Sequence, residues 1–486
     1  MVNSLKTWWW FRRLPVLLGI LGDAGEGNSG AGPASALPKL TQGERTALTR
    51  LLPRVHPKHL ARAARRLHRE DILECYDSDP WLRNYFLNWW EFAHGEAVLS
   101  TYPWNITIPI ADVCNARCTF CTSWLEGTRV LNLDEVPQFA EVLRYARLLG
   151  IAGHGEPLAH PRCDELFEKM ASYLDPRCES YIITNGVFLE KRKQSLRRLN
   201  LRTYNISLNA ATAETHDTVM GLGSEAFGTI LTSIQRLSKE RDKTHVPPGK
   251  TAVAVNISFV INRDNVHEMA NFVRLGNTMG VNNIYLRTLS NVSSPAVGLN
   301  YHLLPPYLHP DFEKHVQDAE EAIAESKANV ITDVASWSTP VLPQGLTQIN
   351  QMRPPVVMER KDALKSREVR DTYARFYEDV KGTGQPLSEA ERDVDISEDG
   401  TNPFNRQPPY HCYFVYHDFI INDFNLRFIP CCYMSRVPGF EVIRYNDSRP
   451  FMDYWNSPAF VTLRKRLQEG PLYGACKKCP AQDVVC

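Results

Sequence analysis

The sequence predicts an α/β protein built on a partial (β/α)6 TIM-like barrel, with a helical N-terminal region and a small α+β C-terminal domain. Two observations predict this fold. Short β-rich runs alternate with helical stretches between residues 104 and 288, which is typical of a parallel sheet wrapped by helices. Cysteines also gather in two groups, one after the first expected strand and one near the C-terminus.

The elements of the barrel follow from local patterns. Asn132 and Glu135 form a capping-box pattern, and the apolar residues that follow keep one helical face, so a helix is expected after residue 132. Six strands are expected, which is fewer than the eight of a closed barrel. The expected strands cover residues 105–110, 147–152, 179–184, 204–208, 252–260 and 283–286, and further helices are expected near residues 162–174, 187–199, 226–240 and 264–279.

Shifts in composition divide the chain. Residues 8–21 are apolar but too short to span a bilayer, which takes about 20 apolar residues. They faintly resemble a signal peptide. The expected divisions are a flexible N-terminal segment over residues 1–40, a helical region over 41–103, the barrel over 104–334, an extended connection over 335–410 and the cysteine-rich domain over 411–486.

The charge balance argues against two classes of partner. The chain of 486 residues holds 55 basic and 55 acidic side chains, so its formal net charge is zero. A neutral chain without a basic stripe is not drawn to nucleic acid, and no segment is expected to span a membrane. The apolar fraction of 43% is ordinary for a soluble protein with a sizeable core.

The most informative segment is Cys114-Asn-Ala-Arg-Cys118-Thr-Phe-Cys121, directly after the first expected strand. Three thiolates at this spacing on one loop can hold three irons of a [4Fe–4S] cube, and the fourth iron is then open to another ligand. An open position distinguishes a catalytic metal centre from a sealed structural one. A zinc ion held by cysteines with this spacing by chance is the alternative.

This cysteine motif, with Phe120 before the third cysteine, resembles the signature of the radical SAM superfamily. The resemblance implies that the open iron binds the amino and carboxylate groups of S-adenosylmethionine (SAM). One electron then breaks a carbon–sulfur bond, and the resulting 5′-deoxyadenosyl radical abstracts hydrogen from a second substrate. The resemblance therefore implies an iron–sulfur oxidoreductase in the cytoplasm, served by an electron donor such as a flavodoxin or a ferredoxin.

Glycine and polar residues follow most of the other expected strands, at the edge where barrels build active sites. They resemble the superfamily's glycine-rich segment near the SAM amino group, its polar pair near the ribose and carboxylate, and a later carboxylate partner. Each could instead be an ordinary turn, a strand end or a surface residue. The candidate cofactor-binding residues are Phe120, Gly153, Gly155, Glu156, Pro157, Asn185, Ser207, Asn209 and Arg287.

The C-terminal cysteines are similar to the SPASM auxiliary-cluster domain, or to its shortened Twitch version, which follows the barrel in many radical SAM enzymes. The matching features are a Pro-Cys-Cys end of a hairpin, a Trp-Asn-Ser segment and a terminal Cys-x-x-Cys. The last ligands of the full pattern are missing, so one auxiliary [4Fe–4S] cluster is expected, with a zinc site as the alternative. The candidate ligands are Cys412, Cys431 or Cys432, Cys476 and Cys479.

An auxiliary cluster can accept an electron from a substrate radical, so the first functional hypothesis is oxidative modification of a peptide or protein side chain. The second is dehydrogenation or rearrangement of a sugar-like small metabolite. The helical pattern of residues 41–98 weakens the peptide hypothesis, because many peptide modifiers carry a winged-helix domain with a β-ribbon. A non-catalytic metal-binding module is the hypothesis from another class.

Overall fold

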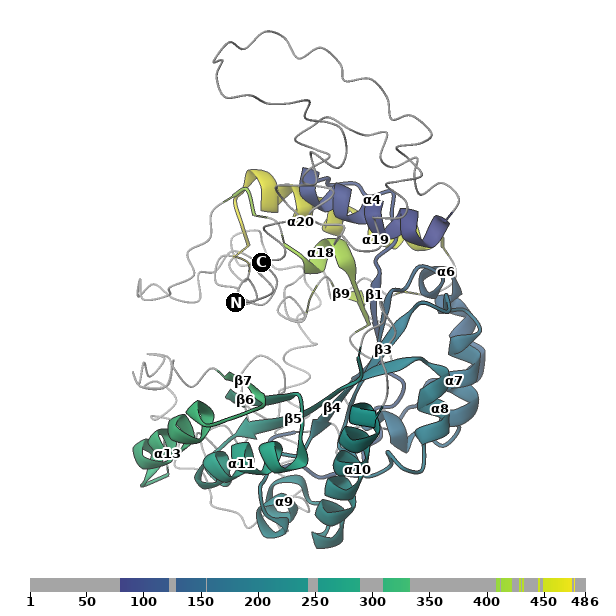
Figure 1. Cartoon of the computed structure of the whole chain (residues 1–486). Helices are drawn as coiled ribbons and strands as arrows, with labels where there is room; N and C mark the ends of the chain where they lie inside the picture. The colour runs from purple at the N-terminus through teal and green to yellow at the C-terminus, as the bar shows by residue number, and fades with distance from the viewer. Residues whose placement is uncertain are drawn as a thin grey trace, which may run out of the picture.

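The computed structural model of the chain contains one curved, nine-stranded sheet (Figure 1). The strand order is β7-β6-β5-β4-β3-β2-β1-β8-β9, and neighbouring strands are parallel except for the antiparallel pair β8–β9. The sheet is open, because β7 and β9 are its edges. The structure describes residues 79–121, 128–153, 155–243, 252–288, 309–332, 408–410, 412–421, 428–429, 431, 445, 449–473 and 476.

The expected open α/β barrel is confirmed, and its sheet is larger than expected. The six expected strands are β1 to β6, and the short strands β7 and β8 add one parallel neighbour on each side of them. Apolar residues at alternate positions bury one face, as in β1, where Ile106 and Ile108 are fully buried. The bounds are β1 Asn105–Ile108, β2 Leu148–Ile151, β3 Glu179–Thr184, β4 Leu201–Ser207, β5 Ala254–Ile261, β6 Asn283–Thr288, β7 Asn329–Thr332, β8 Asp418–Ile421 and β9 Phe428–Ile429.

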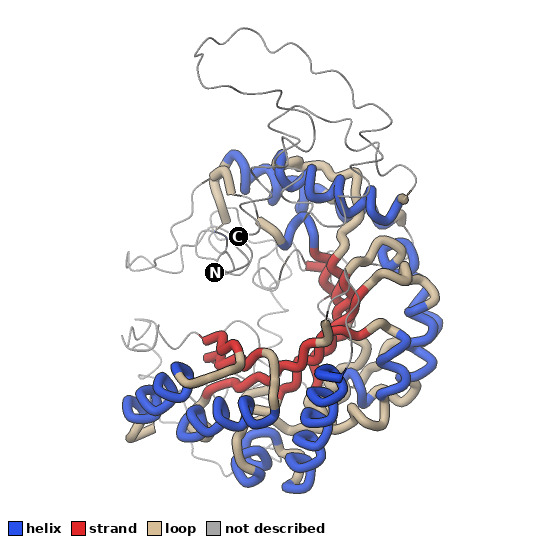
Figure 2. Tube along the Cα trace, in the orientation of Figure 1, coloured by secondary structure: helices blue, strands red, loops and turns tan. Residues whose placement is uncertain are grey.

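Helices follow the strands and lie along the convex side of the sheet (Figure 2). This arrangement leaves the concave side and the carboxyl edge of the sheet to the loops that carry the candidate site residues. The helices of the barrel are α6 Ala140–Leu143, α7 Cys163–Ala171, α8 Lys193–Arg198, α9 Ala213–Met220, α10 Ser224–Lys243, α11 Met269–Met279 and α13 Phe312–Ala324, with 3-10 turns η3 Leu133–Phe139, η4 Pro157–Ala159 and η5 Val266–Glu268.

One helical prediction differs from the structure, and the helices α9 and α13 were not expected. The capping box of Asn132 and Glu135 is present, but the residues after it form the 3-10 turn η3, because Pro137 lies inside this segment and has no N–H for an α-helical bond. Helix α9 was not expected at all. It begins after Thr212, whose hydroxyl accepts a hydrogen bond from the backbone N–H of Thr215 at 3.3 Å.

The C-terminal segment packs against the first strand and against helix α4 (Pro80–His94). Asn88 of α4 donates a hydrogen bond to the carbonyl of Tyr416 at 2.8 Å. The buried Arg464 donates from its guanidinium to the carbonyls of Val415 and Trp455 at 3.0 Å each. Chain segments more than 300 residues apart therefore share one core, which also contains α18 Phe414–His417, α19 Phe451–Trp455 and α20 Pro458–Glu469.

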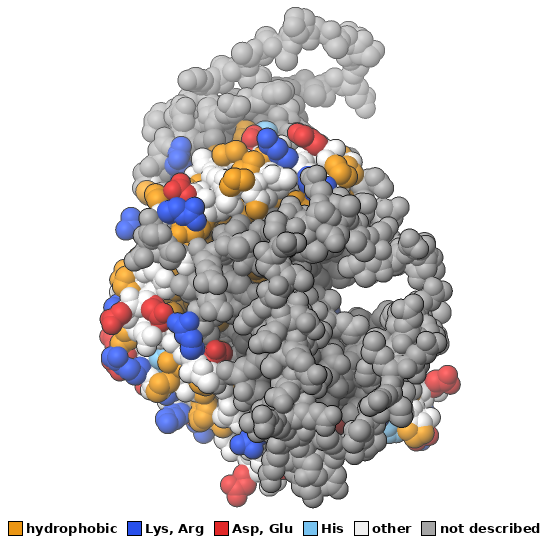
Figure 3. All heavy atoms as spheres, turned by 180° about the vertical axis from the view of Figure 1, so that it is seen from behind, with side chains coloured by type: hydrophobic (Ala, Val, Ile, Leu, Met, Phe, Trp, Pro, Cys, Tyr) orange, Lys and Arg blue, Asp and Glu red, His pale blue; other side chains and the backbone are white. Residues whose placement is uncertain are grey.

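In the segment where a hairpin ending in Pro-Cys-Cys is expected, the short helix α18 precedes β8. Most of the expected connection at residues 335–410 and the whole N-terminal segment at residues 1–40 lie outside the described residues. Across the described surface in Figure 3, basic, acidic and apolar side chains are interspersed. No helix within the described ranges is long and apolar enough to cross a membrane.

Candidate active site

The cysteine loop, residues 114–121, lies after β1 at the carboxyl edge of the sheet. Its entry is held by an isolated antiparallel bridge between Ala111 and Val130. Beside this bridge the N–H of Asp112 donates to the carbonyl of Arg129 at 3.0 Å. The three cysteine side chains in the loop are half-buried, so they are held by the protein while they remain accessible.

The backbone of the cysteine loop is also attached to the end of helix α9. The N–H of Arg117 donates to the carbonyl of Met220 at 2.7 Å, and the N–H of Thr119 donates to that of Val219 at 2.9 Å. These bonds satisfy carbonyls that the end of a helix leaves without intrahelical partners. The loop is therefore attached to α9 through main-chain contacts.

The glycine-rich segment after β2 lies directly against the cysteine loop. A Cβ atom on Gly155 would stand 2.5 Å from the carbonyl oxygen of Val113, and one on Gly153 would stand 2.7 Å from Cβ of Pro109. The N–H of Glu156 donates to the carbonyl of Val113 at 2.9 Å. Both glycines are therefore required by the close approach of two loops, whatever contact they also make with a ligand.

Glu156 joins the ends of β2 and β3. Its buried carboxylate accepts hydrogen bonds from the hydroxyl of Thr184 at 2.6 Å, from the N–H of Asn185 at 2.7 Å and from the N–H of Leu158 at 3.0 Å. Burial raises the pKa of Glu156 above its ordinary value, and the three hydrogen bonds oppose that rise. The carboxylate is thus occupied by the protein itself and acts as a positioning group.

Asn185 completes the link from β3 to the cysteine loop. Its amide Nδ2 donates to Oδ1 of Asn115 at 2.8 Å, and its Oδ1 accepts from the N–H of Val187 at 3.1 Å. Gly186 has φ of +86°, a conformation that favours glycine at this turn. Asn115 stands between the first two cysteines of the motif, and the sequence alone gave no reason to single it out.

Asn209 and Met220 form a second buried contact beside the loop. Asn209 is 1% exposed, its Oδ1 accepts from the N–H of Val260 at 2.7 Å, and its Nδ2 lies 3.0 Å from Sδ of Met220. The same sulfur lies 3.5 Å from Sγ of Cys118. Sequence analysis did not identify Met220, because α9 was not expected; Thr212, which caps that helix, was the available signal.

The remaining candidate residues are less tightly held. Ser207 ends β4 and is half-buried, as is Phe120 in the cysteine loop. Pro157 is buried at the start of η4. Arg287 of β6 is exposed, and its guanidinium lies 5.7 Å from the ring centroid of Tyr285. The structure therefore brings the first four strand ends together around the cysteine loop and leaves Arg287 against its neighbour on β6.

The electrostatic surroundings keep Cys114 protonated in the absence of a metal. Burial, opposed by a hydrogen bond from the backbone of Ala116 and aided by the nearby Glu156 carboxyl and Cys121 thiol, raises the pKa of the Cys114 thiol to about 11. Binding of iron to this sulfur would therefore release a proton, since the thiolate is the ligand.

Three of the C-terminal candidate ligands fall within the described residues. Cys412, Cys431 and Cys476 are all buried, with exposed fractions of 8%, 5% and 8%. Cys431 lies two residues after the end of β9, which pairs with β8 as expected for a hairpin. Cys432 and Cys479 lie outside the described ranges. Among the described cysteines the structure contains no disulfide.

Comparisons with known proteins show what the barrel is similar to. Residues 108–275 match the model of the Radical SAM superfamily. The GTP 3′,8-cyclase of Mycolicibacterium smegmatis is 34% identical over 119 residues, which cover 22% of this chain and 32% of that protein. A probable GTP 3′,8-cyclase of Saccharolobus islandicus is 27% identical over 209 residues, which cover 41% of this chain and 61% of that protein. The chain thus spans less than two thirds of these curated relatives.

Among solved structures, this chain is similar to SuiB of Streptococcus suis bound to S-adenosylmethionine. The similarity covers 90% of this chain and 84% of the SuiB chain. The TM-score is 0.46 and the sequence identity is 14%.

Proposed function

We propose that the cysteine loop holds a [4Fe–4S] cluster at which SAM is cleaved reductively. The premise is that residues 108–275 form a radical SAM domain and that the chain is an enzyme. The proposed ligands are Cys114, Cys118 and Cys121. The superfamily implies the cluster and SAM, and the assignment of these three residues is ours.

The observation that carries this proposal is the way in which the loop is held. Its backbone is bonded to α9 and to Glu156, and Gly155 lets the segment after β2 approach Val113 within contact distance. A loop shaped in this way presents its thiols before any metal is bound. Ligands that are preorganised by main-chain bonds are typical of functional metal sites.

The spacing of the thiols fits a cluster better than one zinc ion. Two thiolates on the same zinc lie no more than about 4.6 Å apart, since each Zn–S bond is about 2.3 Å long. Among the described residues, the donors that all lie within 4.8 Å of one another belong to a different group, and the cysteine loop is not part of it. In a [4Fe–4S] cube each thiolate binds its own iron, so a wider spacing is suitable.

The bound cluster would supply one electron to SAM, and the 5′-deoxyadenosyl radical so released would remove a hydrogen atom from the substrate. The surrounding residues divide into two roles. Glu156, Asn185 and Asn209 hold loops and strand ends in place, because their polar atoms are already bonded within the protein. Ser207 and Phe120 are half-buried beside this edge, so we propose them as the residues nearest to SAM.

We propose one auxiliary cluster in the C-terminal segment and a peptide or protein side chain as the substrate. Burial of Cys412, Cys431 and Cys476 supports a metal centre shielded from water, which suits electron transfer rather than substrate binding. A cluster in that position would accept the electron that an oxidised substrate radical gives up. Thiolate-bound clusters of this kind call for a reducing compartment, so we place the enzyme in the cytoplasm.

The experiment is to measure iron and sulfide after anaerobic reconstitution, and 5′-deoxyadenosine in the presence of dithionite and SAM. The wild type is compared with the Cys114→Ala, Cys118→Ala, Cys121→Ala triple variant. Cys163→Ala is the matched control, because that thiol is fully buried in α7 and its pKa is raised to about 12 by burial. We expect about eight irons in the wild type and in the control, and about four in the triple variant.

Deoxyadenosine should form with the wild type and the control and not with the triple variant. Four irons in the wild type and none in the triple variant would remove the auxiliary cluster and with it the case for oxidation. Iron-free protein without deoxyadenosine would contradict the whole proposal. Candidate peptides and purine nucleotides can then be tested for hydrogen loss to deoxyadenosine, and a response to nucleotides alone would exclude the peptide substrate.

A further inference from the structure

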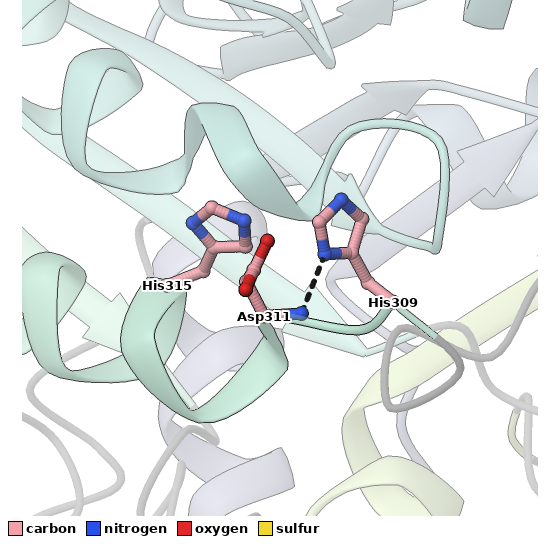
Figure 4. Close-up of side chains that lie close together, drawn as sticks. All are labelled: His309, Asp311 and His315. Atoms are coloured by element: carbon pink, nitrogen blue, oxygen red, sulfur yellow. Dashed lines mark hydrogen bonds between the residues drawn. The ribbon is translucent and has the colours of Figure 1, made fainter.

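Three metal-binding side chains meet at the start of helix α13, on residues that the proposed SAM chemistry does not use. One donor atom from each of His309, Asp311 and His315 lies within 4.8 Å of the other two (Figure 4). Both histidines are half-buried, and Asp311 is exposed. The group is therefore reachable from solvent and is partly shielded by the protein.

The carboxylate of Asp311 is not used to cap the helix. Asp311 is the N-cap residue of α13, where an aspartate usually accepts a hydrogen bond from a backbone N–H of the first turn. Its side chain makes no such bond here. Figure 4 shows the carboxylate between the two imidazole rings instead. Its negative charge offsets the partial positive charge at the helix N-terminus, which otherwise disfavours a cation.

His315 supplies an independent observation. Its Nε2 is buried and has no hydrogen-bond partner among the described atoms. Burying a polar nitrogen without a partner costs about 1–3 kcal/mol, so such atoms usually have a ligand or a bond. The site thus contains a buried nitrogen whose lone pair or proton the protein itself does not satisfy.

The ring geometry suits one tetrahedral ion. The centroids of His309 and His315 are 4.7 Å apart, with an angle of 66° between the rings. Two imidazoles on a tetrahedral zinc have centroids about 5 Å apart, given Zn–N bonds of about 2 Å. His309 Nδ1 now accepts a long hydrogen bond of 3.2 Å from the N–H of Asp311. An ion would displace this bond, because a neutral imidazole has one lone pair.

We propose that His309, Asp311 and His315 bind a zinc ion with one coordination position open to solvent. Two imidazoles and a carboxylate are borderline ligands that select zinc over magnesium or calcium, which prefer oxygen, and over copper(I), which prefers sulfur. Zinc undergoes no redox change, so it is compatible with radical chemistry elsewhere in the chain.

A fourth histidine lies near the proposed zinc site, on the neighbouring 3-10 turn η5. Exposed His267 of η5 has its ring centroid 6.2 Å from that of His309 and 6.3 Å from that of His315. These separations are about 1 Å longer than two imidazoles on one tetrahedral zinc require. His267 is therefore outside the three-residue site. The ion would link His309 and Asp311, which precede α13, to His315 within that helix.

The experiment is a zinc titration of the full chain against a chromophoric chelator, after anaerobic reconstitution of the iron–sulfur clusters. The test variants are His315→Gln and Asp311→Asn. Asp318→Asn is the matched control for the acid, because Asp318 lies on the same helix and close enough to His315 to influence it. His94→Gln is the control for a half-buried histidine elsewhere, which interacts through Nδ1 with the carbonyl of Trp90.

We expect one tightly held zinc per wild-type chain and a loss of affinity of at least about 100-fold in both test variants, since even supporting residues of zinc sites contribute about 10- to 100-fold. Both controls should stay within about threefold of wild type. X-ray absorption at the zinc edge should show nitrogen and oxygen ligands at about 2.0–2.2 Å.

Equal zinc affinity in the wild type and His315→Gln would overturn the proposal, as would a sulfur shell at the zinc edge. Iron in place of zinc at this position would also overturn it. The Cys114→Ala, Cys118→Ala, Cys121→Ala variant separates this proposal from the proposed SAM chemistry. It should lose deoxyadenosine formation and keep the zinc affinity.

Discussion

The cysteine loop after β1 and the cysteines of the C-terminal segment differ in how the protein surrounds them. The first set is half-buried and is held by polar contacts from the ends of β2, β3 and α9. The second set is buried, next to a core of stacked aromatic rings such as Phe428, Trp455 and Phe460. The second set belongs to the same hydrophobic core as β1, the strand that precedes the cysteine loop.

This difference separates two tasks that metal centres perform. A half-buried loop with main-chain support can bind a cofactor and still admit a substrate, whereas a buried centre is shielded from both and can exchange only electrons. We therefore expect the cysteine loop to be sensitive to small changes in backbone packing. The C-terminal region should respond mainly through stability.

The substitution Gly155→Ala should have the largest effect on the cysteine loop. The added Cβ would lie 2.5–2.6 Å from backbone atoms of residues 111–113, which cannot move without shifting the loop. Overpacking of this kind costs about 1–3 kcal/mol. We expect the amount of iron bound by the loop and the rate of deoxyadenosine formation to fall by at least about tenfold. A misplaced ligand should weaken a metal site about as much as the loss of a residue that orients a ligand.

Gly228→Ala is the control, since a Cβ at that position in α10 meets nothing within 4 Å. Alanine inside a helix should stabilise the protein by about 0.5–1 kcal/mol relative to glycine. If Gly155→Ala binds as much iron as Gly228→Ala, the close approach of the two loops does not position the cluster ligands.

Asp418 tests the junction between the two regions, because it lies on β8 beside β1. Burial raises its pKa to about 8 from an ordinary value of 3.8, against a lowering hydrogen bond from Nδ2 of Asn105 at 2.9 Å. Oδ1 of Asn105 is buried without a partner in the described structure. A protonated Asp418 can donate a hydrogen bond from its O–H to this oxygen, so the neutral form of the acid suits the contact with Asn105.

The folded state therefore retains a proton between about pH 4 and 8 that the unfolded chain releases. Stability should fall as pH rises through this window, by about 1.4 kcal/mol per pH unit from this group. Asp418→Asn removes the titration, so its melting temperature relative to wild type should rise steadily from pH 5 to pH 8. Asp453→Asn, on an exposed position of α19, should show no such trend. A constant difference for Asp418→Asn would mean that this carboxyl does not titrate in the window.

The parts that the sequence could predict are those with local signals. Alternating apolar residues gave β1 to β6, and the capping box of Asn132 and Glu135 is present as expected. The four-residue strand β7 and the pairing of β8 with β1 were not expected, because each depends on a partner that is distant in sequence: Asp418 pairs with Asn105, 313 residues away. A short segment of this kind becomes a strand only through tertiary pairing, which no local pattern reveals.

The candidate site shows the same division. The cysteine spacing identified the loop, and Gly153 and Gly155 were identified by their place after β2. Both positions require glycine because a Cβ atom would lie too close to Pro109 or Val113. That requirement depends on how the two loops meet in space, which no local pattern shows. Asn209 was expected near SAM, while the structure has its amide bonded to Val260 and Met220.

Met220→Leu should have the smallest effect. It measures how much the side chains beside the cysteine loop contribute to stability in addition to the backbone hydrogen bonds. The change removes the sulfur that lies 3.0 Å from Nδ2 of Asn209 and 3.5 Å from Sγ of Cys118, while the carbonyl bond to Arg117 can remain. The side chains are similar in volume, so the expected loss of stability is about 1 kcal/mol, mainly from the unpaired amide of Asn209.

Met170→Leu is the matched control, because that methionine is fully buried in α7. Unfolding in urea of the cluster-free protein should give a lower midpoint for Met220→Leu than for this control, with equal slopes. A double-mutant cycle with Cys118→Ala isolates the sulfur–sulfur contact. A coupling energy below about 0.3 kcal/mol, within the range of simple additivity, would mean that Met220 lies next to Cys118 without stabilising it.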